Sequence, residues 1–205
     1  GTSLFLDLIG NKVQGCGSVK RVVVASSRSI YGEGKYKGAN GPVYPGARID
    51  ADLQEGIFEC RDPATGDLVE PLATDEESRI HPSSIYGITK QVQEQLVLVG
   101  AAAIGIQGIA LRYQNVYGPG QSLKNPYTGI LSIFSTLLLQ GKDVNIFEDG
   151  KETRDFVFID DVVAATVSAI DADVSGQAFN VGTGEATDVI TVASALKDAY
   201  GKGGE

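Results

Sequence analysis

The chain has 205 residues, of which 42% are hydrophobic and 21% are charged, with a formal net charge of −9 at pH 7. This composition is typical of a globular protein with one substantial hydrophobic core. The acidic balance argues against binding to nucleic acid or to anionic membrane surfaces. No run of 18 apolar residues occurs, so the sequence predicts no membrane-spanning helix.

The chain contains two isolated cysteines, Cys16 and Cys60, and a single histidine, His81. We therefore expect neither a metal centre nor a Ser-His-Asp triad, because both need more partners than these residues supply. Unpaired cysteines suit a reducing compartment, so we expect a cytoplasmic protein.

The first part of the chain predicts the end of a helix at residues 2–9 and then a strand. The continuous apolar run at 22–25 is typical of a strand buried on both faces of a parallel sheet. Ser26 and Ser27 follow it, at the end of the strand where α/β sheets bind their ligands. The alternative is that these serines cap the next turn.

Residues 33–80 have a different composition, rich in Gly, Pro, Asp and Glu. A loop of this length inside a compact domain is usually functional or disordered. We interpret it as an insertion with one hairpin around Gly66 and Asp67.

A helix is predicted after Pro82, with Ser83 or Ser84 as its N-cap. Its apolar residues recur at steps of three and four, which predicts one buried stripe. The residues of this stripe are Ile85, Ile88, Val92, Leu96 and Val99.

Tyr86 and Lys90 lie one helical turn apart, beside that stripe. An ammonium next to a phenol favours the phenolate, and such a tyrosine can remove a proton from a sugar hydroxyl and return it. The Y-x-x-x-K pattern is common by chance, so the alternative is a surface tyrosine that covers a lysine stem.

The rest of the chain alternates strands and helices. Strands are predicted at 105–113, 144–147, 156–159 and 178–181, and helices at 129–140, at 162–170 and from Thr187 or Asp188 to residue 200. Asp160 or Asp161 is the predicted N-cap of the helix at 162–170. The alternation indicates a parallel α/β sheet with a small appended region, in which 22–25, 109–112 and 178–181 are central strands.

Six motifs follow one another in a characteristic order: VVVASS at 22–27, YG at 31–32, YGITK at 86–90, LRYQNVYGP at 111–119, RDFVFIDD at 154–161 and FNVG at 179–182. In this order they closely resemble the extended short-chain dehydrogenase/reductase family, in its nucleotide-sugar epimerase/dehydratase branch. Within that branch the chain is similar to UDP-glucose 4-epimerase-like enzymes. The insertion and residues 113–122 are similar to the dTDP-rhamnose 4-epimerase type.

The resemblance implies a Rossmann-like parallel sheet with helices on both faces, plus a small substrate-binding lobe. Residues 1–120 would be the catalytic part of the Rossmann-like domain with its insertion at about 33–80. Residues 121–157 and 183–205 would form the substrate lobe, and 158–182 would return to the sheet. The family's G-x-x-G-x-x-G motif is missing, so we expect the N-terminal half of the dinucleotide domain to be absent and the chain to be a fragment.

The resemblance also implies NAD as cofactor, a nucleoside-diphosphate sugar as substrate, and a homodimer for the full-length protein. Ser27 would hydrogen-bond the reacting sugar oxygen, and Tyr86 would be the acid/base. Lys90 would lower the pKa of Tyr86 through its positive charge and would hold the hydroxyls of the nicotinamide ribose. Tyr86 and Tyr113 would lie beside the nicotinamide.

Two further residues are implied on the substrate side, Asn115 near the sugar and Arg154 as a clamp on the diphosphate, for which a guanidinium fork is suited. The alternative for Arg154 is an ion pair with Glu148, Asp149 or Asp155. Asn145 or Phe147 would lie along the nucleotide base, although core packing is the preferred interpretation of Phe147.

Residues 28 and 29 bear on the reaction. The 4,6-dehydratase branch carries an Asp-Glu pair directly after its active-site threonine, where this chain has Arg28 and Ser29. The resemblance therefore favours a 4-epimerase over a 4,6-dehydratase or a reductase. A third hypothesis is a non-catalytic fragment that does not bind NAD.

Overall fold

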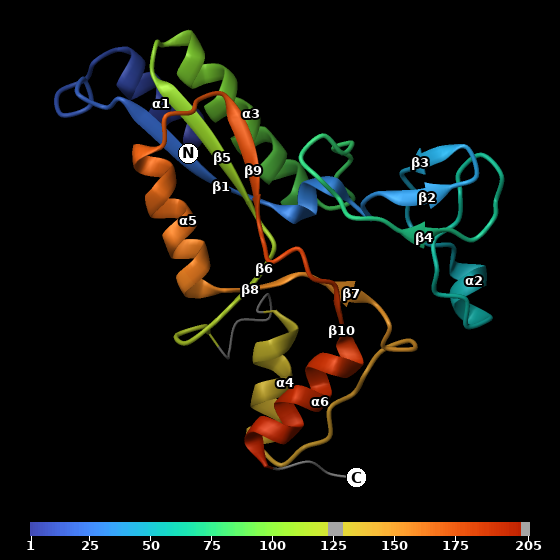
Figure 1. Cartoon of the computed structure of the whole chain (residues 1–205). Coiled ribbons are helices and arrows are strands. Elements are labelled where there is room, and N and C mark those ends of the chain that lie inside the picture. The colour runs from blue at the N-terminus through green and yellow to red at the C-terminus, as the bar shows by residue number, and fades with distance from the viewer. Residues whose placement is uncertain (123–128, 202–205) are drawn as a thin grey trace. The chain divides into compact units, whose positions relative to one another are not determined.

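The structure, a computed structural model, describes residues 1–122 and 129–201. The chain divides into two compact units (Figure 1). Unit 1 comprises Gly1–Tyr113 and Ala164–Val181, and unit 2 comprises Gln114–Val163 and Gly182–Glu205. Residues 123–128 and 202–205, which fall in the predicted substrate lobe, lie outside the described residues.

Unit 1 contains a three-stranded parallel sheet in the order β1-β5-β9. Its strands are β1 (Arg21–Ser27), β5 (Gln107–Tyr113) and β9 (Gln177–Val181). In the register Ser27 lies beside Tyr113, and Tyr113 lies beside Val181. The carboxyl ends of all three strands therefore meet at one edge, and the predicted α/β fold class is confirmed.

The positions of the outer strands differ from the prediction. In the part of the chain that the structure describes, only β5 has a neighbour on both sides, so the prediction that all three runs are central strands is wrong for β1 and β9. Residues 22–24 of β1 are half-buried and Ala25 is exposed.

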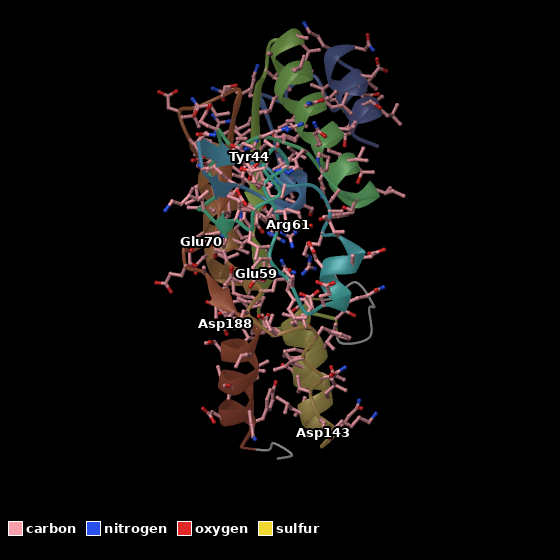
Figure 2. All side chains as sticks on the ribbon, turned by 90° about the vertical axis from the view of Figure 1, so that its right-hand side faces the viewer. Tyr44, Glu59, Arg61, Glu70, Asp143 and Asp188 are labelled. Atoms are coloured by element: carbon pink, nitrogen blue, oxygen red, sulfur yellow. The ribbon has the colours of Figure 1, made fainter. Side chains whose placement is uncertain are left out.

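Helices cover both faces of this sheet. Helix α3 (Ile85–Ala103) packs across β1 and β5, and helix α1 (Thr2–Gly10) packs on α3. Helix α5 (Ile159–Asp171) lies on the opposite face from α3 (Figures 1 and 2). The Arg21 guanidinium donates to the carbonyl oxygens of Ala169, at 2.8 Å, and Ile170, at 2.6 Å, and so fixes the end of α5 to the start of β1.

Helix α5 begins earlier than predicted. Asp160 and Asp161 lie within its first turn, so neither precedes the helix as the predicted N-cap. A carboxylate in the first turn still interacts favourably with the positive end of the helix dipole.

Helix α3 begins as predicted, because the Ser84 hydroxyl accepts a hydrogen bond from the backbone N–H of Gly87 at 3.0 Å. The predicted buried stripe, however, is wrong. Ile85 is 83% exposed, Val99 is 70% exposed, and Ile88 and Val92 are about half exposed. The helix instead buries a neighbouring face made of Gly87, Glu94, Val97 and Ala101.

The insertion in unit 1 is more regular than the sequence suggests. It forms a small antiparallel sheet in the order β3-β2-β4 and one short helix. Its elements are β2 (Tyr36–Gly38), β3 (Gly41–Val43), α2 (Asp50–Gln54) and β4 (Glu70–Pro71). The predicted hairpin around Gly66 is confirmed by an antiparallel bridge between Arg61 and Leu68. The strands of the β2-β3 hairpin are too short for a periodic signal.

Unit 2 is built on two helices, α4 (Ile130–Leu139) and α6 (Val189–Tyr200), which share a core of Phe134, Val189 and Val192. The helices predicted at 129–140 and from Thr187 or Asp188 to residue 200 are thereby confirmed. The Asp188 carboxylate is the N-cap of α6, since it accepts from the backbone N–H of Thr191 at 2.6 Å.

Two short strand pairs complete unit 2. Strand β6 (Asn115–Tyr117) pairs in parallel with β8 (Phe156–Phe158), and β7 (Thr153–Arg154) pairs antiparallel with β10 (Thr187–Asp188). The strand predicted at 144–147 is wrong, because these described residues form no strand. Val144 and Ile146 pack on the core of unit 2, but Phe147 is 79% exposed, so core packing is wrong for Phe147.

Candidate active site

Ser27 stands at the carboxyl end of β1, where its side chain is buried. The chain then enters a 3-10 turn, η1 (Arg28–Tyr31). The Ser27 hydroxyl accepts from the backbone N–H of Ser29 at 3.2 Å and lies 2.6 Å from the Ser29 hydroxyl. Ser27 therefore caps the turn, as the alternative interpretation expected, and at the same time lies at the ligand-binding edge of the sheet.

Tyr86 and Lys90 lie on one face of the first turns of α3. The Lys90 ammonium is 5.8 Å from the centroid of the Tyr86 ring. It donates to the carbonyl oxygen of Ala25 on β1 at 2.9 Å, and so connects the helix to the strand that carries Ser27. Tyr86 is 55% exposed. Among the residues that the structure describes, no hydrogen bond joins Tyr86 to Ser27, whose hydroxyl is paired with Ser29.

Gly87 brings α3 into direct contact with the η1 turn. A Cβ atom at this position would lie 2.5 Å from the Ser29 carbonyl oxygen and 2.9 Å from the Pro82 Cβ. Neither distance is compatible with a side chain, so the close approach depends on glycine. Because Gly87 follows Tyr86 directly, this contact places the Tyr86 backbone beside the turn that holds Ser27.

Tyr113 lies at the end of β5, where it is the register partner of Ser27. Its hydroxyl lies 2.7 Å from the Thr166 hydroxyl in α5. Unit 1 thus brings Ser27, Tyr86, Lys90 and Tyr113 to the same edge of one sheet.

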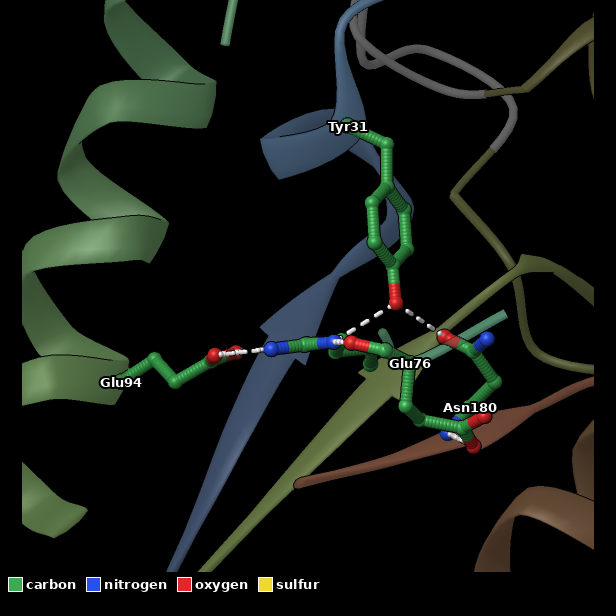
Figure 3. Close-up of polar contacts among 5 residues, drawn as sticks. Tyr31, Glu76, Glu94 and Asn180 are labelled. Carbon is green, nitrogen blue, oxygen red and sulfur yellow. Dashed lines mark hydrogen bonds and ion pairs between the residues drawn. The ribbon is translucent and has the colours of Figure 1, made fainter. Parts of the chain in front are cut away.

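A buried network that the sequence analysis did not predict lies behind this edge (Figure 3). The Arg112 guanidinium contacts the Glu94 carboxylate at 2.6 Å and donates to the Tyr31 hydroxyl at 2.7 Å. The Tyr31 hydroxyl donates in turn to the Asn180 side-chain oxygen at 2.9 Å. Arg112 also donates to the carbonyl oxygen of Glu76 at 3.0 Å. The network joins α3, η1, β5, β9 and the end of the insertion.

Burial and neighbouring charges shift the pKa values of the groups in this network in opposite directions. Burial raises the pKa of the Tyr31 phenol, and the neighbouring Arg112 offsets only part of that rise. Desolvation lowers the pKa of Arg112, but its contacts with Glu94 and Tyr31 raise it by more, so the net shift is upward. Arg112 stays charged, and Tyr31 stays a neutral donor. The sequence does carry a signal for this network, since an arginine inside the apolar run of β5 needs a buried partner.

The two substrate-side candidates belong to unit 2 and flank Asp155. The backbone N–H of Asn115 donates to the Asp155 carbonyl oxygen at 2.9 Å. The Asp155 carboxylate accepts from the backbone N–H groups of Thr183 and Gly184, each at 2.9 Å. Asp155 therefore holds β6, β8 and the loop after β9 together.

Arg154 is half-buried and forms an ion pair with Glu152 at 2.5 Å. Its partner is therefore a different acid from the three that the sequence analysis named. Asn145 and Phe147 are exposed.

Comparisons with known proteins test the resemblance. The sequence pattern of the NAD dependent epimerase/dehydratase family matches residues 63–182. This chain belongs to the NAD dependent epimerase/dehydratase family. The predicted family is thereby confirmed.

Several epimerases are similar to this chain along nearly its whole length. A dTDP-L-rhamnose 4-epimerase of Burkholderia thailandensis is 38% identical over 190 residues, which cover 90% of this chain and 50% of that protein. The crystal structure of UDP-glucose 4-epimerase from Thermotoga maritima with UDP-glucose matches with a TM-score of 0.73 and 27% identity, over 100% of this chain and 53% of that chain.

A third family member is the UDP-glucose 4-epimerase of Thermus thermophilus in complex with NAD. It matches with a TM-score of 0.63 and 26% identity, over 98% of this chain and 54% of that chain. The chain thus spans about half the length of the relatives that it matches.

No helix among residues 1–122 and 129–201 is long and apolar enough to cross a membrane.

Proposed function

We propose that the protein to which this chain belongs is an NAD-dependent nucleotide-sugar 4-epimerase, acting on a nucleoside-diphosphate sugar. The observation that carries this proposal is the placement of Ser27, Tyr86 and Lys90 at one edge of the parallel sheet in unit 1. The similarity to a dTDP-L-rhamnose 4-epimerase and to UDP-glucose 4-epimerases supports it.

Each of the three residues has a distinct task in this proposal. Tyr86 removes the proton from the C4 hydroxyl of the sugar and returns it, and the residue is exposed enough to reach a ligand. Lys90 places its positive charge 5.8 Å from the centroid of the Tyr86 ring, where it attracts the negative charge that develops on Tyr86 during the proton transfer. Ser27 hydrogen-bonds the reacting oxygen as that oxygen becomes a carbonyl.

The residues at this edge fit the nicotinamide end of NAD. Lys90 presents an ammonium above the end of β1, and Tyr113 presents a half-buried ring at the end of β5. The Ser26 hydroxyl beside them is buried and has no hydrogen-bond partner among the described residues. Bound NAD would supply the hydride acceptor and donor for oxidation and reduction at C4 of the sugar. In this proposal Lys90 and Tyr86 hold the ribose, and Tyr113 orients the nicotinamide.

Arg154 and Asn115 are the proposed substrate ligands of unit 2. A guanidinium fork is suited to a diphosphate. Because Arg154 is paired with the half-exposed Glu152, a diphosphate would compete with Glu152 for the guanidinium. We therefore infer that Glu152 is displaced when the substrate binds.

A 4,6-dehydratase is the second candidate, and the η1 turn counts against it. Elimination of water needs a group that protonates the leaving hydroxyl. In place of the Asp-Glu pair of that branch, the turn carries Arg28 and Ser29, and the Ser29 hydroxyl is paired with Ser27. A reductase needs no such acid. It is separated from the epimerase by an assay of C4 epimerisation of the nucleotide sugar.

We further propose that the full-length protein is a homodimer. The apolar stripe of α3 is exposed in unit 1 except for the half-buried Leu96, and Leu4 and Phe5 of the neighbouring helix α1 are exposed too. Exposed apolar surface at helical spacing indicates a partner, and a second copy supplies the same surface. Sedimentation equilibrium of the full-length protein tests this, since Val92→Asp should convert the dimer into a monomer.

The test of the proposed activity is to express the full-length protein and to follow C4 epimerisation of UDP-glucose and of dTDP-L-rhamnose. We expect turnover with added or co-purified NAD, and a loss of several orders of magnitude in Tyr86→Phe with an unchanged melting temperature. Tyr200→Phe, at the end of α6, is the matched control and should retain full activity. No exchange at C4 with either sugar, or full activity of Tyr86→Phe, would contradict the proposal.

A further inference from the structure

Ser29 has two contacts with the proposed active-site serine. Its backbone N–H donates to the Ser27 hydroxyl oxygen at 3.2 Å, and its own hydroxyl oxygen lies 2.6 Å from the same atom. The second distance is that of a strong hydroxyl–hydroxyl hydrogen bond, in which either serine can be the donor.

The choice of donor decides what Ser27 can offer to a ligand. A serine hydroxyl has one proton to donate and two lone pairs that accept. If Ser29 donates to Ser27, both lone pairs of Ser27 are occupied, one by each contact of Ser29. Only the proton of Ser27 is then left for a ligand. If Ser27 donates to Ser29 instead, Ser27 has only a lone pair left.

The proposed reaction needs the first arrangement. When Tyr86 takes the proton of the C4 hydroxyl and hydride leaves C4, the sugar oxygen becomes a carbonyl, which accepts hydrogen bonds and cannot donate. A Ser27 that has only a lone pair left has no hydrogen bond to give this oxygen. A Ser27 whose lone pairs are filled by Ser29 points its proton at it.

We propose that Ser29 is a positioning residue that holds Ser27 as a hydrogen-bond donor to the reacting sugar oxygen. The inference rests on the proposed epimerase function. It also assigns the path of the proton, which passes directly from the sugar hydroxyl to Tyr86, because Ser27 has no lone pair left to receive it.

The backbone around Ser29 supports this role. A Cβ atom on Gly87 would lie only 2.5 Å from the Ser29 carbonyl oxygen, so α3 packs directly on Ser29. The Ser29 N–H is fixed by the capping hydrogen bond to Ser27. With its backbone held from both sides, the Ser29 side chain keeps its hydroxyl close to Ser27.

The test compares Ser29→Ala and Ser29→Thr in the full-length, NAD-loaded protein. We expect kcat of Ser29→Ala to fall about tenfold, which corresponds to about 1.4 kcal/mol, with little change in KM. The melting temperature should stay the same, because the Ser27 hydroxyl still caps the turn by accepting from the backbone N–H of residue 29. Ser29→Thr, which keeps a hydroxyl, should recover most of the rate. Ser83→Ala, an exposed serine before α3, is the matched control and should have no effect.

The pH dependence of kcat separates positioning of Ser27 from an effect on Tyr86. Because Tyr86 and Lys90 are intact in Ser29→Ala, the profile should keep its shape while its plateau drops. A wild-type kcat in Ser29→Ala, a shifted profile, or a rate loss that Ser29→Thr does not rescue would overturn the inference alone. Absence of epimerisation in the wild-type protein would overturn the proposed function and this inference with it.

Discussion

Arg112 and Glu94 form a buried ion pair in unit 1, although 18 residues separate them along the chain. Their side chains are 5% and 3% exposed, and the closest N–O distance is 2.6 Å. Glu94 lies two turns after Tyr86 on α3, and Arg112 also holds the Tyr31 hydroxyl at the end of η1. The pair therefore connects the tyrosine helix to the serine turn.

We expect the destabilisation caused by single substitutions in this pair to be non-additive in the double variant. Glu94→Gln or Arg112→Met leaves one buried charge without its partner, which costs about 3–5 kcal/mol. The double variant removes both charges and should cost less than the sum of the two. Urea unfolding of the full-length protein measures all three, and a double variant whose cost equals the sum would contradict the coupling.

Gly87→Ala should separate α3 from the η1 turn. The added Cβ would meet the Ser29 carbonyl oxygen at 2.5 Å, so the helix must shift. Overpacking of this kind costs about 1–3 kcal/mol. Epimerase turnover should also fall, because Tyr86 moves with the helix. Gly46→Ala is the control, since no atom lies within 4 Å of its Cβ position. Equal stability and turnover of the two variants would rule out a close contact at Gly87.

Alkaline pH should destabilise the insertion through Tyr36 and Cys60, which share a side-chain hydrogen bond. Burial raises the pKa of the Tyr36 phenol, and burial also raises the pKa of the Cys60 thiol. In the unfolded chain the thiol ionises near pH 8.5 and the phenol near pH 10, before they do so in the folded protein. The contribution of these two groups to the free energy of unfolding should therefore be fully present below about pH 8.5. It should decline as the pH rises further.

The variant Tyr36→Phe tests this sign. It removes the ionising phenol, so the decline in the free energy of unfolding above about pH 10 should become less steep than in the wild type. Denaturant titrations between neutral and alkaline pH measure the slope. An identical slope in both proteins would show that Tyr36 does not contribute.

The 205-residue chain by itself should bind NAD weakly and show no turnover. The pyrophosphate of a dinucleotide is held mainly by a glycine-rich loop at a helix N-terminus, and no G-x-x-G-x-x-G motif occurs in this sequence. Hydrogen bonds from Lys90 and Tyr86 are worth about 0.5–1.5 kcal/mol each, against an association cost of about 4–15 kcal/mol. Calorimetric titration tests this, with the full-length protein as the control. Micromolar affinity in a monomer of the isolated chain would contradict it.

The elements set by neighbouring residues could be predicted from the sequence. The run at 22–25 became a strand, Ser84 and Asp188 became N-caps, and the helix after Pro82 formed at its predicted place. These features depend on contacts within a few residues, which the sequence displays directly. The order of the six motifs identified the family for the same reason, since each motif is local.

What the sequence left open depended on which surfaces meet. Helical periodicity showed that Ile85 and Val99 share a stripe of α3, but not that this stripe faces away from the sheet. Ala101 faces β5 instead and Gly87 faces the η1 turn, because small side chains permit the closest approach. Likewise the pairing of Glu94 with Arg112, and of Ser29 with Ser27, was fixed only by folding. A sequence shows that a buried charge or hydroxyl needs a partner, but only the packing of helix on strand selects which one.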